Sequence, residues 1–313
     1  VLVRTAEALC RLRRGREALG PAGEAAALFS QLRRERDAAE ARYWLAFAHH
    51  LADNSAEART ILRGLLGAVR DGMAVQPDFQ FRVLVALANV EGWEGRHPEA
   101  LAYLEEARGL TNDLDDWRRA ALLHNLSRTY AGAGDDEAAY RTGSQALALF
   151  QAIAARREVA SMENTLALTL VRLGNVPRAR EMADAARLHA DTLPDTSFLS
   201  FVRETEAQIA LAAGDLPAAH THLDAGAQAA EATGNREAAA AIHRTRARVL
   251  AAEGRKSEAL AELERAADGF RELQMPGRLR PVLSEWADLL SAEGRTEEAL
   301  ARYREALALA QGA

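Results

Sequence analysis

Residues 247–266 read ARVLAAEGRKSEALAELERA, a stretch in which small side chains recur at fixed intervals. Ala247 comes seven residues before Gly254, Ala259 comes five residues after it, and Ala266 follows seven residues later. The same arrangement returns along the chain. The alanines equivalent to Ala259 are Ala18, Ala58, Ala100, Ala139, Ala179, Ala219, Ala259 and Ala299, spaced by 40, 42, 39, 40, 40, 40 and 40 residues. A sequence that repeats at such a period indicates structural units that follow one another, here eight of them.

Glycine marks the middle of most units. Gly95, Gly134, Gly174, Gly214, Gly254 and Gly294 each stand five residues before the alanine of their unit. Helices often end in the left-handed backbone conformation, which glycine adopts without the penalty that a Cβ imposes. In the second unit Asp53 and Asn54 take this place, and these are the next best residues at positive φ. We therefore expect two helices in each unit, joined by a tight turn.

Two further rows of mostly small residues predict where the helices cross. One row stands seven residues before each turn and consists of Ala8, Ala46, Ala88, Ser127, Ala167, Ala207, Ala247 and Ala287. The other stands seven residues after each repeat alanine and consists of Ala25, Leu65, Ala107, Ala146, Ala186, Gly226, Ala266 and Ala306. Small side chains at a crossing let two helix axes approach closely. This predicts antiparallel helix pairs that stack on one another.

The pattern resembles the tetratricopeptide repeat (TPR), and the resemblance covers essentially the whole chain. It implies an all-α fold, a right-handed superhelical solenoid of about eight TPR-like helix-turn-helix repeats. We expect a single array over 1–313, with repeats at roughly 1–38, 39–80, 81–119, 120–159, 160–199, 200–239, 240–279 and 280–313. The period is longer than in the common form and resembles repeats of bacterial signal-transduction regulators. Because Val1 lies inside an expected helix, we expect the chain to be part of a longer one.

The composition limits the classes of function. The formal net charge is −6, from 39 basic and 45 acidic residues, whereas nucleic-acid-binding proteins usually carry a basic patch. Cys10 is the only cysteine, so neither an internal disulfide nor a thiolate metal cluster can form. No apolar run approaches the roughly 18 residues that would cross a bilayer, and no signal peptide is visible. We expect a cytoplasmic protein in which this segment binds neither nucleic acid nor membrane.

Catalytic and metal-binding motifs are missing from the sequence. It contains no G-x-x-x-x-G-K-S/T phosphate-binding loop, no H-E-x-x-H and no G-x-S-x-G motif. The close histidine pairs are His49 with His50 and His220 with His222. Helical side chains one or two residues apart point to different faces, so neither pair forms a ready metal site. We therefore expect no enzymatic activity, no metal and no cofactor.

In solenoids of paired helices, the first helices line a concave face where ligands usually bind. The register places residues on this face two or three positions before the first small row and one position after it. The chemically specific residues there are Asn89, His124, Asn125, Arg128, Asn164, Gln208, Arg244 and Arg248, with the aromatic residues Tyr43 and Phe47 and, one turn further along, Trp93. Other positions on the expected face include Trp44, Thr165, Leu168, Glu204, Thr205, Thr245, Ser284, Glu285 and Asp288.

Each residue type on this expected face suits a different part of a ligand. An asparagine amide carries both a donor and an acceptor, so it can bind a peptide backbone whatever the side chains are. The arginines suit a carboxylate, which they bind through two hydrogen bonds, and the aromatic residues suit an apolar pocket. The alternative for all of them is ordinary packing or hydrogen bonding between repeats.

Together these observations predict a scaffold that captures a protein or peptide partner in its concave groove. The alternative is a ligand-sensing or peptide-sensing arm of a multidomain bacterial transcriptional regulator or signalling NTPase, whose output domain lies upstream of residue 1. The ligand is then a peptide or a small-molecule signal. A regulatory appendage of a catalytic domain, and a homo-oligomer formed through the terminal repeats, are also open.

Overall fold

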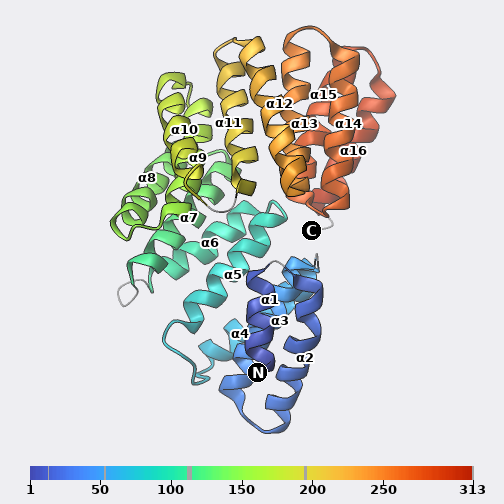
Figure 1. Ribbon diagram of the computed structural model, residues 1–313. Helices are drawn as coiled ribbons and strands as arrows, with labels where there is room; N and C mark the ends of the chain where they lie inside the picture. Colours follow the sequence, from blue (N-terminus) through green and yellow to red (C-terminus); the bar gives the residue numbers. More distant parts are fainter. Residues whose placement is uncertain (13, 53, 111–114, 194–195, 312–313) are drawn as a thin grey trace. The chain divides into compact units, whose positions relative to one another are not determined.

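The computed structural model describes residues 1–12, 14–52, 54–110, 115–193 and 196–311. Within these residues all regular structure is helical, with sixteen α-helices, one short 3₁₀ helix and no strand (Figure 1). The all-α fold predicted from the repeat pattern is confirmed. By their contacts the residues divide into two compact units, residues 1–92 with 96–114 and residues 93–95 with 115–313.

The first unit is built from the helices at the start of the chain. They are α1 (Leu2–Arg11), α2 (Gly15–Gln31), α3 (Glu35–Leu51), α4 (Ser55–Arg70), α5 (Phe79–Trp93) and α6 (His97–Arg108). α2 packs along α3, α1 packs against both of these helices, and α4 packs on α3. The short turns between α1, α2, α3 and α4 make neighbouring helices antiparallel, as the repeat pattern predicts.

The second unit continues the same arrangement. Its helices are α7 (Asp116–Ala133), α8 (Asp136–Ala152), α9 (Arg156–Arg172), α10 (Val176–Ala190), α11 (Leu199–Ala212), α12 (Leu216–Thr233), α13 (Arg236–Ala252), α14 (Lys256–Glu272), α15 (Pro276–Ala292) and α16 (Thr296–Gln311), with the 3₁₀ helix η2 (Thr196–Phe198) before α11. Each odd-numbered helix packs along the even-numbered helix that follows it, and each even-numbered helix packs on the next odd one. Neighbouring odd-numbered helices from α7 to α13 also touch. Within this unit the pairs are therefore stacked serially (Figure 1).

In the six helix pairs that have a turn glycine, the turn has the backbone conformation that glycine predicts. Gly95, Gly134, Gly174, Gly214, Gly254 and Gly294 all have φ between 74° and 85°. In the second repeat, the prediction of a positive φ is wrong at Asn54. This residue has a φ of −102° and stands directly before α4 as its N-cap. Its neighbour Asp53 lies outside the described residues. Asn54 stands one position after the place that glycine takes in the other repeats, where Asp135, Asn175 and Asp215 are also N-caps.

The turns between pairs also enter the left-handed region, which the repeat pattern does not reveal. Gly72 and Gly234 have φ values of 96° and 64°. Arg33, Ala154 and Gln274 have φ values of 54°, 55° and 50°, although each carries a Cβ. Left-handed backbone costs a non-glycine residue about 1–2 kcal/mol. Three of these five turns carry a residue other than glycine, so the sequence gives no fixed signal here.

The small residues predicted at the helix crossings are buried, with one exception. Every repeat alanine from Ala18 to Ala299 is at most 3% exposed. Ala8 is exposed, and Ala6 is buried in its place. The prediction counted back from Gly15, which begins α2 and is not a turn residue. Counting back from Ala18 by the interval of the other repeats gives Ala6.

The helix crossings are tight where the smallest side chains stand. At Gly143 in α8, an added Cβ would lie 2.7 Å from the Ser127 hydroxyl and 2.9 Å from a Leu166 methyl. Ser127 is fully buried in α7, and its hydroxyl donates to the Ala139 carbonyl over 2.7 Å. α7, α8 and α9 therefore meet at this crossing. Such contacts fix the rotation of each first helix and so decide which of its residues face outward.

Candidate functional site

The first helices of the second unit present one continuous row of predicted ligand-binding positions. We call this surface the first-helix face; it consists of His124, Asn125 and Arg128 on α7, Asn164, Thr165 and Leu168 on α9, Glu204, Thr205 and Gln208 on α11, Arg244, Thr245 and Arg248 on α13, and Ser284, Glu285 and Asp288 on α15. Side-chain interactions join α11 to α13 and α13 to α15 along it. The register read from the sequence therefore brings these residues onto neighbouring helices.

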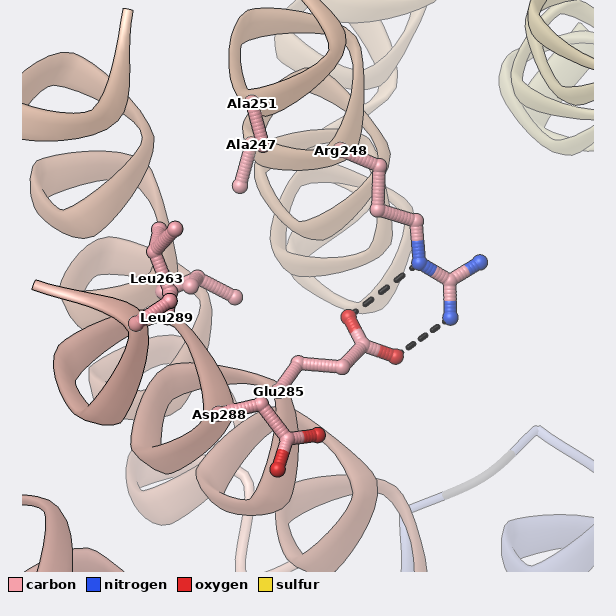
Figure 2. A pocket seen from close by; sticks show the side chains of 8 residues that line it. Ala247, Arg248, Ala251, Leu263, Glu285, Asp288 and Leu289 are labelled. Carbon is pink, nitrogen blue, oxygen red and sulfur yellow. Dashed lines mark hydrogen bonds and ion pairs between the residues drawn. The ribbon is translucent and has the colours of Figure 1, made fainter. Parts of the chain in front are cut away.

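At the α13–α15 end, two arginines bind one glutamate of the chain itself. The Arg244 guanidinium donates to Glu285 Oε1 from Nε over 3.1 Å and from Nη2 over 2.5 Å. Arg248 donates from Nε to Glu285 Oε2 over 3.1 Å, and its Nη2 also binds this carboxylate (Figure 2). The fork that the sequence assigned to a ligand carboxylate is therefore occupied by Glu285.

The shared contacts shift the pKa values of these groups. Burial would raise the pKa of Glu285, but the hydrogen bonds from Arg248 and Arg244 outweigh it and lower the pKa. Burial lowers the pKa of Arg244, and the nearby charge of Arg248 acts in the same direction. Arg244, Arg248 and Glu285 therefore form an internal ion-pair cluster, in which the shared carboxylate holds the two guanidinium groups close together.

The middle of the face is a buried hydrogen-bonded group around Glu204. Its side chain is only 7% exposed, and its Oε1 accepts from Gln208 Nε2 over 2.6 Å and from the Thr245 hydroxyl of the next first helix. The Thr205 hydroxyl beside it is buried without a hydrogen-bond partner among the described residues. Gln208, predicted to contact a ligand, thus serves partly to satisfy a buried carboxylate.

Asn164 on α9 is a second residue of this face with a polar atom that the described part of the chain leaves without a partner. Its side chain is 8% exposed, and its Oδ1 is buried with no hydrogen-bond partner in the described part of the chain. Its neighbour Thr165 donates its hydroxyl to the Ser161 carbonyl, one turn back in the same helix. An unsatisfied buried amide oxygen costs about 1–3 kcal/mol, so a ligand or water donor at Asn164 would be favourable.

The α7 end combines an exposed cation with a neutral imidazole. Arg128 is exposed, Asn125 is half-buried, and the His124 ring meets the Phe150 ring edge-on with centroids 6.2 Å apart. Burial, and secondly the charge of Arg128, lowers the pKa of His124 from 6.5 to about 4. His124 is therefore neutral near pH 7, and one ring nitrogen can accept a hydrogen bond.

The remaining predicted residues stand in α3 and α5. Tyr43, Trp44 and Phe47 form a chain of edge-on ring contacts on α3, with centroids 5.3 Å and 6.1 Å apart. Trp44 and Phe47 also pack on the buried cluster around Cys10. Much of this aromatic group is therefore core packing, the alternative that the sequence left open. Asn89 and Trp93, both on α5, are half-buried.

Tyr43 is further enclosed by a charged pair. The Arg82 guanidinium lies 4.8 Å from the Tyr43 ring centroid and donates to Glu40 Oε1 over 3.0 Å. Burial raises the pKa of Tyr43 to about 12, although the charge of Arg82 opposes the shift. The Tyr43 phenol is therefore uncharged near pH 7, and Tyr43 contacts Trp44 and Arg82 through its aromatic ring.

Sequence reasoning missed the most buried carboxylate of the first unit. Glu91 on α5 is 0% exposed and accepts from Arg59 over 3.2 Å, from Arg63 over 3.3 Å and from Arg96 over 2.6 Å. The signal was an acidic residue within the apolar run VLVALANVEGW, residues 83–93. Its arginines come from α4 and from the turn after α5, which the repeat pattern does not single out.

Two kinds of feature are missing from the part of the chain that the structure describes. No group of three or more histidine, cysteine, aspartate or glutamate side chains is arranged to hold a metal ion. His220 and His222 instead face Glu253 and Glu206, at 2.9 Å and 3.1 Å. None of the described helices combines the length and apolarity needed to cross a membrane.

Comparison with known proteins matches this architecture. Residues 79–152 match the family described as tetratricopeptide repeat. The chain is similar to a Rap protein complexed with competence and sporulation factor, with a TM-score of 0.66 and 13% identity over 100% of this chain and 97% of that one. It is similar to NprR in complex with its cognate peptide NprX, with a TM-score of 0.67 and 12% identity over 99% of this chain and 95% of that one.

A third similar structure is aspartyl phosphate phosphatase F from Bacillus subtilis, with a TM-score of 0.68 and 12% identity over 91% of this chain and 74% of that one. No curated protein matches the chain in sequence. At such low identities the structural similarity establishes the fold, and the family match covers the α5–α8 region. With the serial helix pairs, the turn glycines and the buried rows of alanine, these findings agree. Residues 79–152 match the tetratricopeptide repeat, and the chain has the helical-repeat fold of the similar structures.

Proposed function

We propose that this protein binds a peptide, or an extended segment of a partner protein, on the first-helix face of its second unit. The observation that carries the proposal is the buried Asn164 Oδ1, which lacks a hydrogen-bond partner in the described part of the chain. An amide placed in this way suits the N–H of a peptide backbone. The first helices of such arrays form a concave surface, which suits an extended ligand.

The chemistry along α7 and α9 is consistent with recognition of a peptide backbone. Asn125 and Asn164 each offer a donor and an acceptor, and neutral His124 adds an acceptor. Arg128 is exposed beside them and suits a carboxylate or a carbonyl of the ligand. Two of the similar structures hold a peptide or a competence and sporulation factor. The proposed role is binding, without catalysis.

A regulatory role is the second candidate. The chain is similar over 98% of its length to NprR from B. thuringiensis, a quorum sensor, with a TM-score of 0.62 and 13% identity. We propose on this basis that the array serves as a peptide-sensing arm of a bacterial regulator. The ligand then carries a signal, and its binding shifts the equilibrium between two arrangements of the helix pairs.

Selection of peptides from a random displayed library, with the full chain as bait, tests the first proposal. We expect the wild-type chain to enrich a family of related peptides. The double substitution Asn125→Ala with Arg128→Ala should reduce binding of these peptides by about a hundredfold, because it removes an amide and a charge-assisted contact. Circular dichroism and the melting temperature should stay unchanged, since both side chains reach the surface.

A matched control removes the same two kinds of side chain, a guanidinium and an amide, from a second helix of the array. Arg141→Ala with Gln145→Ala removes an exposed guanidinium and an exposed amide from α8, the second helix of the same pair. This variant should bind the selected peptides as tightly as the wild type. Equal losses in the two double variants, or unaltered binding in both, would show that the first-helix face is not where these peptides bind.

A further inference from the structure

A pocket of about 430 Å³ lies between α13, α14 and α15. It is lined by Ala247, Arg248 and Ala251 of α13, Leu263 of α14, and Glu285, Asp288, Leu289 and Ala292 of α15. Figure 2 shows Leu263 and Leu289 across the pocket from Ala247 and Ala251, with the Arg248–Glu285 pair on another side. The volume falls within the range of ligand pockets, roughly 300–1,000 Å³. Five of the eight lining side chains are aliphatic.

The pocket lies where one repeat carries a small residue and the preceding repeat carries a large one. Ala251 stands 40 residues after Leu211, at the same place in the repeat. Leu211 is partly buried and packs on the apolar cluster that contains Leu223, the counterpart of Leu263. Replacing leucine by alanine at this register removes the side chain that would fill the space between neighbouring first helices. A leucine fits at this register, since the preceding repeat accommodates one.

The charged groups that line the pocket each have an ion-pair or hydrogen-bond partner within the chain. Glu285 is bound by both Arg244 and Arg248, and the Asp288 carboxylate accepts a hydrogen bond from the Tyr303 hydroxyl. Two arginines and two carboxylates leave no net charge around the opening. An ion brought against the aliphatic lining would lose hydration without gaining a partner, whereas an apolar group would gain from leaving water. The pocket therefore favours an uncharged aliphatic group.

We propose that this pocket receives an aliphatic side chain, of the size of leucine, isoleucine or methionine, from the peptide bound on the first-helix face. The inference rests on the proposed function and adds a rule of specificity to it. Arg248 and Glu285 belong to both the pocket and the first-helix face, so a peptide lying along that face passes the opening. The Arg248–Glu285 ion pair fixes these two side chains at the opening, and because their charges cancel the pair adds no net charge there.

The pocket is tested by NMR on the full chain carrying ¹³C-labelled leucine and alanine methyl groups. The probes are N-acetyl-leucinamide and its lysine and aspartate counterparts. We expect saturable shifts at the methyls of Leu263 and Leu289 with the leucine probe, and binding weaker by about tenfold or more for the charged probes. Absent or equal responses to the three probes would contradict the proposal.

The decisive variant is Ala251→Leu, which places at this position the side chain found one repeat earlier. It should abolish the response to N-acetyl-leucinamide while the melting temperature stays close to that of the wild type. Ala252→Leu adds the same side chain to the next, exposed position of α13 and should leave the response unchanged. A response that survives Ala251→Leu would overturn the assignment.

Peptide selection separates this inference from the proposed function. If the library yields related peptides without a shared aliphatic position, or if Ala251→Leu selects the same peptides, the pocket assignment fails and the binding role stands. If the methyl shifts behave as expected but no peptide is enriched, the pocket is real and the proposed peptide-binding function fails.

Discussion

The polar residues at the two ends of the first-helix face differ in how far the chain itself satisfies their hydrogen bonds. At the α13–α15 end, Arg244 and Arg248 already bind Glu285, so the polar groups there satisfy one another. At the α7–α9 end, Asn164 Oδ1 is buried without a partner among the described residues, and burial keeps His124 neutral. Both ends carried residues predicted from sequence to contact a ligand. Only one end leaves polar chemistry for a ligand to complete.

The difference follows from side-chain length and from the spacing of the repeats. An arginine reaches across to the next first helix and finds a carboxylate there, whereas an asparagine is too short to do so. At the α13–α15 end the long charged residues therefore bind one another, whereas at α9 the short amide of Asn164 remains for a ligand. Recognition is then expected to be polar at α7–α9 and apolar at the pocket between α13 and α15.

The largest expected effect comes from breaking the satisfied end. Glu285→Ala leaves Arg244 and Arg248 close together without their shared carboxylate. Loss of one partner from a fully buried ion pair costs about 3–5 kcal/mol. Because the Arg248 side chain is 38% exposed, we expect about 2–3 kcal/mol. Urea unfolding at pH 7 measures the change.

The control for this prediction is Glu258→Ala, which removes an exposed carboxylate paired with Arg255 at 2.7 Å. Exposed pairs contribute little because water screens them, so the unfolding midpoint should not move. If Glu285→Ala is as mild as Glu258→Ala, the cluster is not a stabilising ion pair. The two ends of the face would then not differ in the way described above.

The fold was predictable because it depends on local chemistry repeated many times. Each turn glycine at positive φ and each buried alanine row follows from a rule that acts within one repeat. The failures at Ala8 and Asn54 arose where a repeat lacks the usual turn glycine and the register had to be assumed. The left-handed turns at Arg33, Ala154 and Gln274 could not be predicted because these residues carry a Cβ and give no glycine signal.

The candidate site was predictable only in part. The register placed Arg244 and Glu285 on the first-helix face, but their pairing depends on which rotamers meet between neighbouring repeats. The sequence contains both residues, 41 positions apart, and no rule that couples them. The pocket at Ala251 depends on the difference between two repeats. A comparison of each repeat with its neighbour, position by position, would have found it.

The second prediction concerns the neutral histidine at the α7 end. The pKa of His124 is about 4 in the folded chain against 6.5 when unperturbed, so the unfolded state binds the proton more strongly. Stability is therefore fully present above pH 6.5 and is lost as the pH falls toward 4. Between pH 7 and pH 5 the loss from this group should be about 2 kcal/mol.

Urea unfolding of wild type and His124→Gln at both pH values measures this loss as a difference, so that other titrating groups cancel. Arg128→Gln should reduce the wild-type loss, because the charge of Arg128 also lowers the pKa of His124. An identical pH dependence in wild type and His124→Gln would show that the imidazole is not held neutral by its surroundings.

The smallest expected change in stability is at Asn164, and it gives the sharpest contrast between the two parts of the face. Asn164→Leu removes an amide whose Oδ1 has no partner in the described part of the chain, so the free energy of unfolding should change by less than about 1 kcal/mol. Gln208→Leu removes the amide that donates to buried Glu204 over 2.6 Å. This substitution should lower the free energy of unfolding by about 1–3 kcal/mol, because it leaves a buried carboxylate with one donor fewer.

Binding should not follow stability. Asn164→Leu should weaken the peptides selected on the wild-type chain by about tenfold or more, because the ligand loses the acceptor that the chain does not use. An amide that is retained for a ligand is expected to make the chain less stable when no ligand is bound. If Asn164→Leu destabilises the chain as much as Gln208→Leu does and leaves peptide binding intact, the amide serves the packing of α9. The polar end of the face would then have to be sought at Asn125 and Arg128 alone.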